Sequence, residues 1–274
     1  MSIKAQVEDA VFLAKSQRFV GALTALMLAI AASSRRVFPR GTNSVEKPKE
    51  EMGDREAFTL FLGGRIRKLL FGHLGGPETG NSGISVRFKG KQYDLAYILY
   101  KYYRCELIHN GELPENIEFA PSQHPEPGRL AVSISSGEKM ILDYGWIDLL
   151  INAVVYAECN GPEFGIKHYR LGQNSGVDES VFRNDAVARF GITPGRYEIL
   201  KHGVKTIGPH IVRSSKDEEV IAHFSKVVES GEINGGAITG LRSYGLSNDN
   251  GVLLPKGLEI LRHISEAFDL TEIS

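Results

Sequence analysis

The stretch Tyr93–Gly111, YDLAYILYKYYRCELIHNG, says most about the fold of this chain. Its apolar residues recur at steps of three and four, which predicts a helix from Tyr93 to Ile108. Asn110 and Gly111 end that helix, because glycine readily adopts the left-handed conformation that follows many helices. We therefore expect an aromatic helix that ends at a sharp, polar turn.

Helical periodicity also dominates the sequence around this stretch. It predicts one long helix over Gln6–Ser33, a second over Arg55–Leu70 with Asp54 as its N-cap, and a last apolar helix over Gly145–Cys159. Short alternating segments predict a strand at Ile84–Phe88 and a hairpin formed by Leu130–Ile134 and Lys139–Leu142. The first part of the chain should thus be a helical bundle with a small β-hairpin insert.

A second domain is predicted after Asn160–Gly161–Pro162, a sequence that favours a break. The length of 274 residues is typical of two domains, which we place at residues 1–159 and 160–274. In the second we expect a marginal helix near Asp185, a helix starting at Thr193–Pro194, helices Asp217–Glu229 (capped by Ser215), Ala237–Tyr244 and Pro255–Phe268, and a strand Val252–Leu254. The predicted fold class is mainly α, with an α+β C-terminal domain.

Composition excludes several classes of protein. Hydrophobic residues make up 42% and charged residues 24%, so the chain is not intrinsically disordered. The net charge of -1 gives no overall positive field for nucleic acid. Two cysteines exclude a disulfide scaffold and favour the reducing cytoplasm. The apolar run Phe19–Ala32 is shorter than a spanning helix, and we predict a core helix and no membrane contact.

Arg104 and His109 are the candidate catalytic pair. Five residues on an ideal helix correspond to about 140°, so the two share a face only if the helix unwinds near His109. Arginine holds a phosphate through two parallel hydrogen bonds, and histidine transfers protons near neutral pH. Together they could cleave an RNA phosphodiester without metal: one moves the proton, and the other stabilises charge on the phosphoryl oxygens. The alternative is that both only satisfy a helix end.

The segment Tyr100–Gly111, YKYYRCELIHNG, resembles the Arg-x4-6-His motif of the HEPN superfamily of helical domains. The resemblance covers about residues 1–159 and extends to the order of the helices. It implies a metal-independent endoribonuclease with Arg104 and His109 as the active pair, and a homodimer in which two motifs form one cleft. The family often has a polar residue directly after the arginine. This chain has Cys105 there, and Glu106 or Asn110 is the candidate substitute.

Other side chains near the motif carry weaker predictions. Lys101 lies one turn before Arg104 and could steer a phosphate. We assign the repeated tyrosines Tyr97, Tyr100 and Tyr103 to packing rather than base stacking. The histidines show no metal-ligand spacing and the glycines of 72–83 no phosphate loop, so we predict no metal and no cofactor.

The C-terminal layout of short helix, turn, strand and helix resembles a winged-helix module. Residues 214–274 carry five basic and ten acidic groups, a net charge of -5 that opposes phosphate binding. Residues 160–213 carry eight basic and five acidic groups, a net charge of +3. The predicted nucleic-acid-binding residues are Arg183, Arg189, Arg196, Lys201, Lys205 and, on the recognition helix beside Tyr244, Arg242. The alternative is a degenerate module that contacts protein.

Two functions follow from these patterns. The first is a cytoplasmic, metal-independent endoribonuclease that cuts RNA in a toxin or anti-virus role. The second is a non-catalytic HEPN dimer that carries a C-terminal reader of nucleic acid or protein. RNA cleavage in EDTA by the unaltered chain and by His109→Ala distinguishes them.

Overall fold

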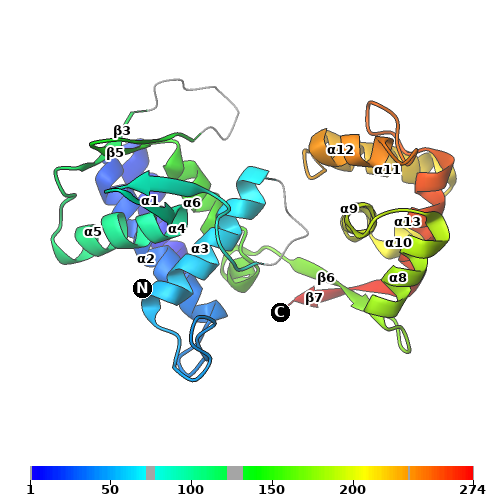
Figure 1. The fold of residues 1–274 in the computed structure, drawn as a ribbon, viewed down its shortest axis with the longest axis horizontal. Coiled ribbons are helices and arrows are strands. Elements are labelled where there is room, and N and C mark those ends of the chain that lie inside the picture. The colour runs from blue at the N-terminus through cyan, green and yellow to red at the C-terminus, as the bar shows by residue number, and fades with distance from the viewer. Residues whose placement is uncertain (1, 72–77, 122–131, 234, 274) are drawn as a thin grey trace. The chain divides into compact units, whose positions relative to one another are not determined.

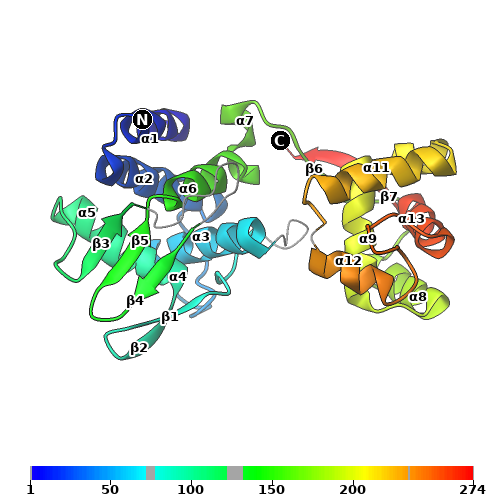
Figure 2. The same cartoon turned by 90° about the horizontal axis from the view of Figure 1, so that it is seen from above.

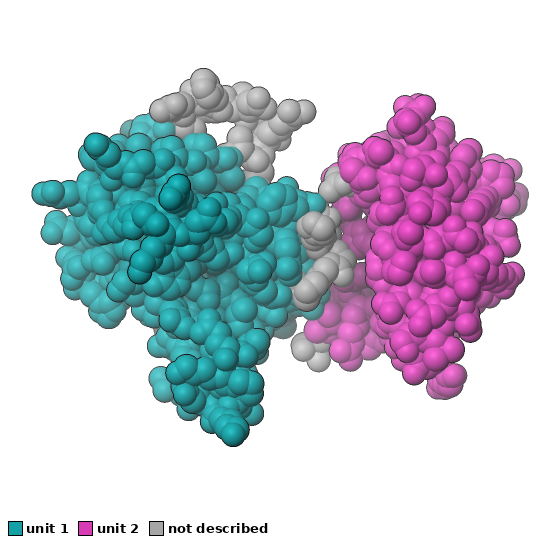
Figure 3. Space-filling view, in the orientation of Figure 1, with its two compact units in different colours: residues 1–71, 76–166 teal, residues 72–75, 167–274 magenta. Residues whose placement is uncertain are grey.

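The structure, a computed structural model, describes residues 2–71, 78–121, 132–233 and 235–273. These residues form two compact units, which Figure 3 shows in two colours. Unit 1 comprises the described residues up to Ile166, and unit 2 those from Lys167 onward. The boundary therefore follows the short elements η2 (Glu158–Asn160) and α7 (Gly161–Phe164), which belong to unit 1.

Unit 1 is mainly helical, with α1 (Ile3–Lys15), α2 (Phe19–Val37), α3 (Asp54–Phe71) and α6 (Trp146–Val155) around its core (Figure 1). The core contains the apolar side chains Leu23, Leu26, Phe58, Phe61, Tyr103, Trp146 and Leu150. Within α3, Gly63 and Gly64 let the chain at 78–82 lie against the helix, since a Cβ at either would stand 2.3 Å from a backbone oxygen. The predicted second helix is confirmed.

The single helix predicted over Gln6–Ser33 is wrong, because the chain turns back between α1 and α2. Gln17 adopts a left-handed φ of 58°. The Gln17 N–H donates to the Ala14 oxygen at 2.9 Å, and the Arg18 N–H to the Leu13 oxygen at 2.8 Å. This is a Schellman motif, which usually contains glycine at the left-handed position. Because Gln17 stands where a glycine is usual, the sequence did not indicate that the helix ends there.

Helix α2 is longer than the apolar run that we recognised in the sequence. By length and composition it could cross a membrane, although 44% of its most apolar window is buried inside unit 1. Residues Ala22, Leu23, Leu26, Met27, Ala29 and Ile30 are fully buried in the core. A core helix of a soluble protein has these properties, so the described structure is consistent with solubility.

Two small sheets lie beside the helices of unit 1 (Figure 2). The first is an antiparallel hairpin of β1 (Ser85–Phe88) and β2 (Lys91–Asp94). The second has the order β3-β5-β4, with β3 (Ile117–Ala120) parallel to β5 (Met140–Asp143) and β4 (Ile134–Ser136) antiparallel to it. The predicted hairpin insert is therefore part of a three-stranded sheet; residues 130 and 131, where we expected its first strand to begin, are outside the described ones.

Unit 2 is also mainly helical. Its helices are α8 (Glu179–Phe190), α9 (Pro194–Ile207), α10 (Pro209–Ser214), α11 (Asp217–Glu229), α12 (Gly235–Arg242) and α13 (Pro255–Ala267). An antiparallel ribbon of β6 (His168–Gln173) and β7 (Phe268–Ile273) joins its first and last segments. The buried residues Tyr197, Leu200, Phe224, Ile260, Leu261 and Phe268 form the core.

Two expectations for unit 2 are wrong. Val252–Leu254 is not a strand, because only an isolated bridge pairs Ser247 with Leu253. The N-cap of α11 is Lys216 rather than Ser215. The β6–β7 ribbon was not predicted, since its two strands are separated by almost the whole unit and local periodicity carries no information about such pairing.

Candidate functional site

The segment Leu95–His109 forms one continuous helix with an irregular middle. It consists of α4 (Leu95–Ile98), a π-helical segment labelled η1 (Leu99–Arg104) and α5 (Cys105–His109). The Asp94 carboxylate begins it by accepting from the Ala96 N–H at 2.9 Å. Asn110 caps it and Gly111 follows with a φ of 77°, as predicted. The expected unwinding at His109 does not occur; the helix is irregular before Arg104 instead, and π-helical segments are frequent at functional sites.

This helix has a clear inner and outer face. Leu99, Tyr103 and Leu107 are buried at four-residue steps. On the opposite side, Tyr97, Lys101, Cys105 and His109 also follow one another at four-residue steps. Lys101 and His109 are exposed, and Tyr97 and Cys105 are half-buried. We call these four residues the outer stripe; residues spaced by four lie on the same face of a helix.

Arg104 lies on the flank of the outer stripe. Its guanidinium lies over the Tyr100 ring, 5.3 Å from the centroid. Tyr100 in turn packs edge-on against Phe58 of α3, with 5.4 Å between the ring centroids. The Nε atom of Arg104 is buried without a hydrogen-bond partner, and no carboxylate among the described residues forms an ion pair with this side chain. The terminal Nη atoms of Arg104 likewise have no hydrogen-bond partner among the described residues, and they are the donors available for an anion.

The Asp54 carboxylate interacts with the charges of three arginines. It is ion-paired with Arg35 of α2. The hydrogen bond from Arg35 lowers the pKa of Asp54, and the charges of Arg35, Arg104 and Arg40 lower it further against the effect of burial. We call Arg35, Arg40 and Arg104 the arginine cluster. The sequence analysis did not include Arg35 and Arg40 in the site. Two signals were available: the closely spaced arginines in RRVFPR, and the prediction that Asp54 begins a helix.

The remaining predicted catalytic residues do not join Arg104. The Asn110 side chain donates to the Glu106 carboxylate at 2.5 Å, so these two bind each other. Burial and the neighbouring Cys105 thiol raise the pKa of the Tyr100 phenol. No hydrogen bond or ring contact joins Arg104 to His109 in the structure as described. Five residues of helix set the two side chains about 140° apart, not in a shared notch.

The basic residues predicted to bind nucleic acid in unit 2 are largely occupied. Lys201 is ion-paired with Glu179, and Arg242 with Asp249. Arg196 donates to the Gly240 oxygen at 3.2 Å and lies over Tyr244, 5.1 Å from its centroid. Arg189 is exposed, while Arg183 and Lys205 are half-buried. The contacts of Lys201, Arg242 and Arg196 join neighbouring segments of unit 2, whereas Arg183, Arg189 and Lys205 form no ion pair with a described carboxylate.

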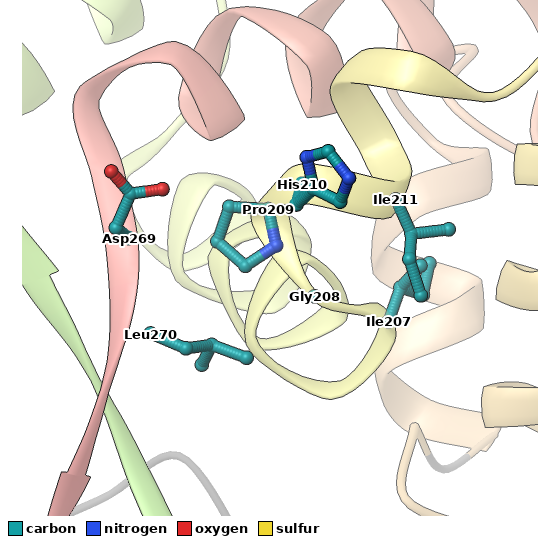
Figure 4. Close-up of a pocket in the computed structure, with 7 residues that line it drawn as sticks. All are labelled: Ile207, Gly208, Pro209, His210, Ile211, Asp269 and Leu270. Atoms are coloured by element: carbon teal, nitrogen blue, oxygen red, sulfur yellow. The ribbon is translucent and has the colours of Figure 1, made fainter.

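An apolar hollow lies in the described part of each unit. Figure 4 shows the hollow of unit 2, of about 480 Å³, between the turn that joins α9 to α10 and strand β7. Its one carboxylate, Asp269, is ion-paired with Arg213, and His210 lies at its edge. The groove of unit 1, of about 500 Å³, lies between α1 and α2. Across the described ranges, no group of three or more histidine, cysteine or carboxylate side chains is placed to hold a metal ion.

Comparison with known proteins gives one result. The family model described as Rv1289 matches residues 2–188, which include all the described residues of unit 1 and reach into α8. The chain belongs to the Rv1289 family. Neither a curated protein nor a solved structure matches it significantly. The Rv1289 match contains the helix with Arg104 and His109 and ends before most of unit 2, so the part of the chain that defines the family is the part that contains the candidate site.

Proposed function

We propose that this protein is a metal-independent endoribonuclease of HEPN type, with its active site in unit 1. The observation that carries the proposal is the state of Arg104: no described residue pairs with it, it lies over Tyr100, and it is on the helix that ends at the exposed His109. A guanidinium without an internal partner is the group that a phosphate requires. The helical layout of unit 1 and the Arg-x4-His spacing further support this proposal.

The proposed chemistry is an intramolecular transfer at phosphorus. The imidazole of His109 takes the proton of the ribose 2′-hydroxyl, or as imidazolium gives one to the leaving 5′-oxygen. The 2′-oxygen forms a bond to phosphorus and the bond from phosphorus to the 5′-oxygen breaks, which leaves a 2′,3′-cyclic phosphate and a 5′-hydroxyl. Arg104 stabilises the charge on the phosphoryl oxygens. Glu106 and Asn110, the candidate substitutes for a polar residue at Cys105, are hydrogen-bonded to each other and would have to exchange that bond for one to the substrate.

Cleavage of single-stranded RNA in EDTA tests this proposal. The unaltered chain should cleave, and His109→Ala should lose at least about a hundredfold in rate, the usual loss for a general acid or base. His210→Ala is the matched control, because His210 is an exposed histidine in unit 2. Equal cleavage by His109→Ala and the unaltered chain contradicts the proposal. In cells, induced expression should slow growth unless His109 is replaced, as expected for a cytoplasmic toxin or anti-virus protein.

A specific observation favours a second candidate function, a dimeric RNA-binding scaffold without catalysis. Arg104 and His109 are about 140° apart on a regular helix, and α5 is regular up to His109. A single strand of RNA would then contact the arginine cluster without reaching the imidazole. RNA binding by the unaltered chain with no cleavage of varied RNAs supports this second function.

We propose that the chain forms a homodimer through α1 and α2. Phe12 is 69% exposed at the edge of the groove, whose other apolar lining includes Leu13, Ala25 and Leu28. Across a two-fold axis, the exposed ring of each protomer can pack into the apolar groove of the other. Phe12→Ser should shift the mass in solution from dimer to monomer, whereas Val181→Ser, which removes another exposed side chain, should not. A monomeric unaltered chain contradicts the proposal.

We further propose that unit 2 is a winged-helix-like module that contacts protein. Helices α11, α12 and α13 follow one another in the order of helices in a winged-helix module. Between α12 and α13, where such a module has a β-hairpin wing, the Ser247–Leu253 bridge closes a turn. The ion pair between Arg242 and Asp249 joins α12 to that turn. Because this pairing and the net charge of residues 214–274 both disfavour phosphate, a protein partner fits better than nucleic acid.

A further inference from the structure

A second surface of unit 1 combines tyrosine rings with lysines. Tyr93 and Tyr97 are stacked, with 5.2 Å between the ring centroids and 9° between the planes. Tyr102 lies edge-on to Tyr93 at 6.4 Å, and burial and a hydrogen bond with Tyr93 raise the pKa of its phenol. All three rings are half-buried, so part of each remains accessible. Figure 2 shows the hairpin that carries Tyr93 beside α4, which carries Tyr97.

Three lysines surround these rings. The Lys89 ammonium lies 5.3 Å from the centroid of Phe88 and 5.4 Å from that of Tyr102. Lys91 and Lys101 are exposed. None of the three is ion-paired with a carboxylate of the described residues. We call Lys89, Lys91, Lys101 and the three tyrosines the tyrosine–lysine surface.

The strand register separates this surface from the other face of the hairpin. Lys91 is paired with Phe88, and Tyr93 with Val86, so these side chains share one face. Arg87 is paired with Gln92 on the opposite face and is equally exposed. Arg87 is therefore on the opposite face of the hairpin from Lys91 and Tyr93.

We propose that the tyrosine–lysine surface binds single-stranded RNA, with bases stacked on the tyrosine rings and phosphates held by the lysines. Aromatic rings beside unpaired cations are the usual combination for single strands, because each base can stack and each phosphate meets a charge. A duplex keeps the faces of its bases inside the stack. Lys101 also belongs to the outer stripe, so a strand bound here continues toward His109. This inference rests on the proposed function and specifies its substrate class.

Binding measured apart from cleavage tests the inference. The experiment uses the full chain with His109→Ala, in EDTA, and the fluorescence anisotropy of a short labelled oligouridine over a range of salt. A labelled RNA duplex of the same length is the comparison. The single strand should bind at least about tenfold more tightly than the duplex. Replacing Lys89 and Lys91 by glutamine should weaken binding and reduce the salt slope by about 1.4, which is about 0.7 for each lost phosphate contact.

The tyrosines are tested by a pair of substitutions at one position. Tyr97→Leu should weaken single-strand binding about thirtyfold, the middle of the range for one stacked base, and Tyr97→Phe should retain it. Arg87→Gln is the control, because it removes one exposed charge from the opposite face of the same hairpin. Retained thermal unfolding and circular dichroism establish that each variant is folded.

The outcomes separate this inference from the proposed nuclease. If the lysine and Tyr97→Leu variants bind the single strand as tightly as the parent while the unaltered chain cleaves RNA, the inference is wrong and the nuclease stands. If binding depends on these residues but no RNA is cleaved, the inference stands and the nuclease fails. Tighter binding to the duplex, or an equal loss with Arg87→Gln, also overturns the inference.

Discussion

The ion pairs of the two units differ in how deeply they are buried. In unit 1 one acidic group is enclosed with its cations: Glu78 is bound by Arg65 and Lys68, whose side chains are only 5% and 6% exposed. On its surface, Lys91, Lys101 and Arg104 have no carboxylate partner among the described residues, whereas Lys47 and Arg55 are ion-paired. In unit 2 the ion pairs of Lys201, Arg213, Arg242 and Arg262 are all more exposed than those of Glu78, and the exposed Arg189 forms no ion pair with a described carboxylate. Counting charges along a sequence thus does not show which cations are free to bind a ligand.

The largest expected effect comes from removing the enclosed charge of unit 1. Glu78→Gln leaves Arg65 and Lys68 buried without compensation, which should lower the free energy of unfolding by about 3–5 kcal/mol. Trp146, the one tryptophan of the chain, is buried in unit 1 and reports its unfolding by fluorescence in a denaturant titration.

Two exposed pairs provide the controls for this prediction. Glu50→Gln breaks the exposed pair with Lys47 in unit 1, and Asp249→Asn breaks the exposed pair with Arg242 in unit 2. Each should cost less than about 1 kcal/mol, since exposed pairs contribute little. A loss for Glu78→Gln no larger than theirs would mean that the enclosed charges do not stabilise unit 1.

Replacing Arg104, which has no ion pair, and Arg242, which has one, should show which unit takes part in RNA cleavage. Arg104→Ala should lower the rate of RNA cleavage by about a hundredfold or more, the loss typical of a group that stabilises developing charge. Arg242→Ala should leave cleavage and the salt slope of RNA binding unchanged, because Asp249 already neutralises that guanidinium. A comparable loss from Arg242→Ala would show that unit 2 also binds the substrate.

Lowering the pH should reduce the stabilisation of the fold by Glu78. Burial alone would raise the pKa of Glu78, but the charges of Arg65 and Lys68 lower it below the ordinary value of 4.5. A carboxylate with a lowered pKa stabilises the fold above its unfolded pKa, and the effect is lost as the pH falls through its folded pKa. The stability difference between the unaltered chain and Glu78→Gln should therefore be full at neutral pH and shrink below pH 4.5. A constant difference would assign the loss to packing.

Local sequence patterns predicted the helices better than they predicted which strands pair with each other. The Asn110–Gly111 stop and helix α11 were predicted because their signals lie within one turn of sequence. Strand β3 and the β6–β7 ribbon were missed, since each pairs with a segment far along the chain. At the candidate site, the sequence predicted the exposure of His109 at a helix end, but neither the π-helical segment that contains Arg104 nor the ion pair between Arg35 and Asp54.

The smallest predicted effects concern one stop motif used in both units. Helix α8 ends as α1 does: the Gly191 N–H donates to the Ala188 oxygen and the Ile192 N–H to the Val187 oxygen, with a left-handed φ of 59° at Gly191. Unit 1 has Gln17 at the equivalent position. Because a left-handed conformation is unfavourable for residues with a Cβ, Gln17→Gly should stabilise unit 1 by about 0.5–1 kcal/mol, and Gly191→Ala should destabilise unit 2 by about 1 kcal/mol.

The opposite signs make this pair of substitutions decisive. No side chain would meet a Cβ at Gly191 within 4 Å, so a loss there reflects backbone conformation alone. Gln17 is exposed, so its replacement removes no buried contact. The Trp146 transition measures the first change and far-UV circular dichroism the second. If Gln17→Gly destabilises unit 1 instead, the glutamine side chain contributes more than the strain at Gln17 costs, and the turn between α1 and α2 depends on a contact of Gln17 rather than on the Schellman hydrogen bonds.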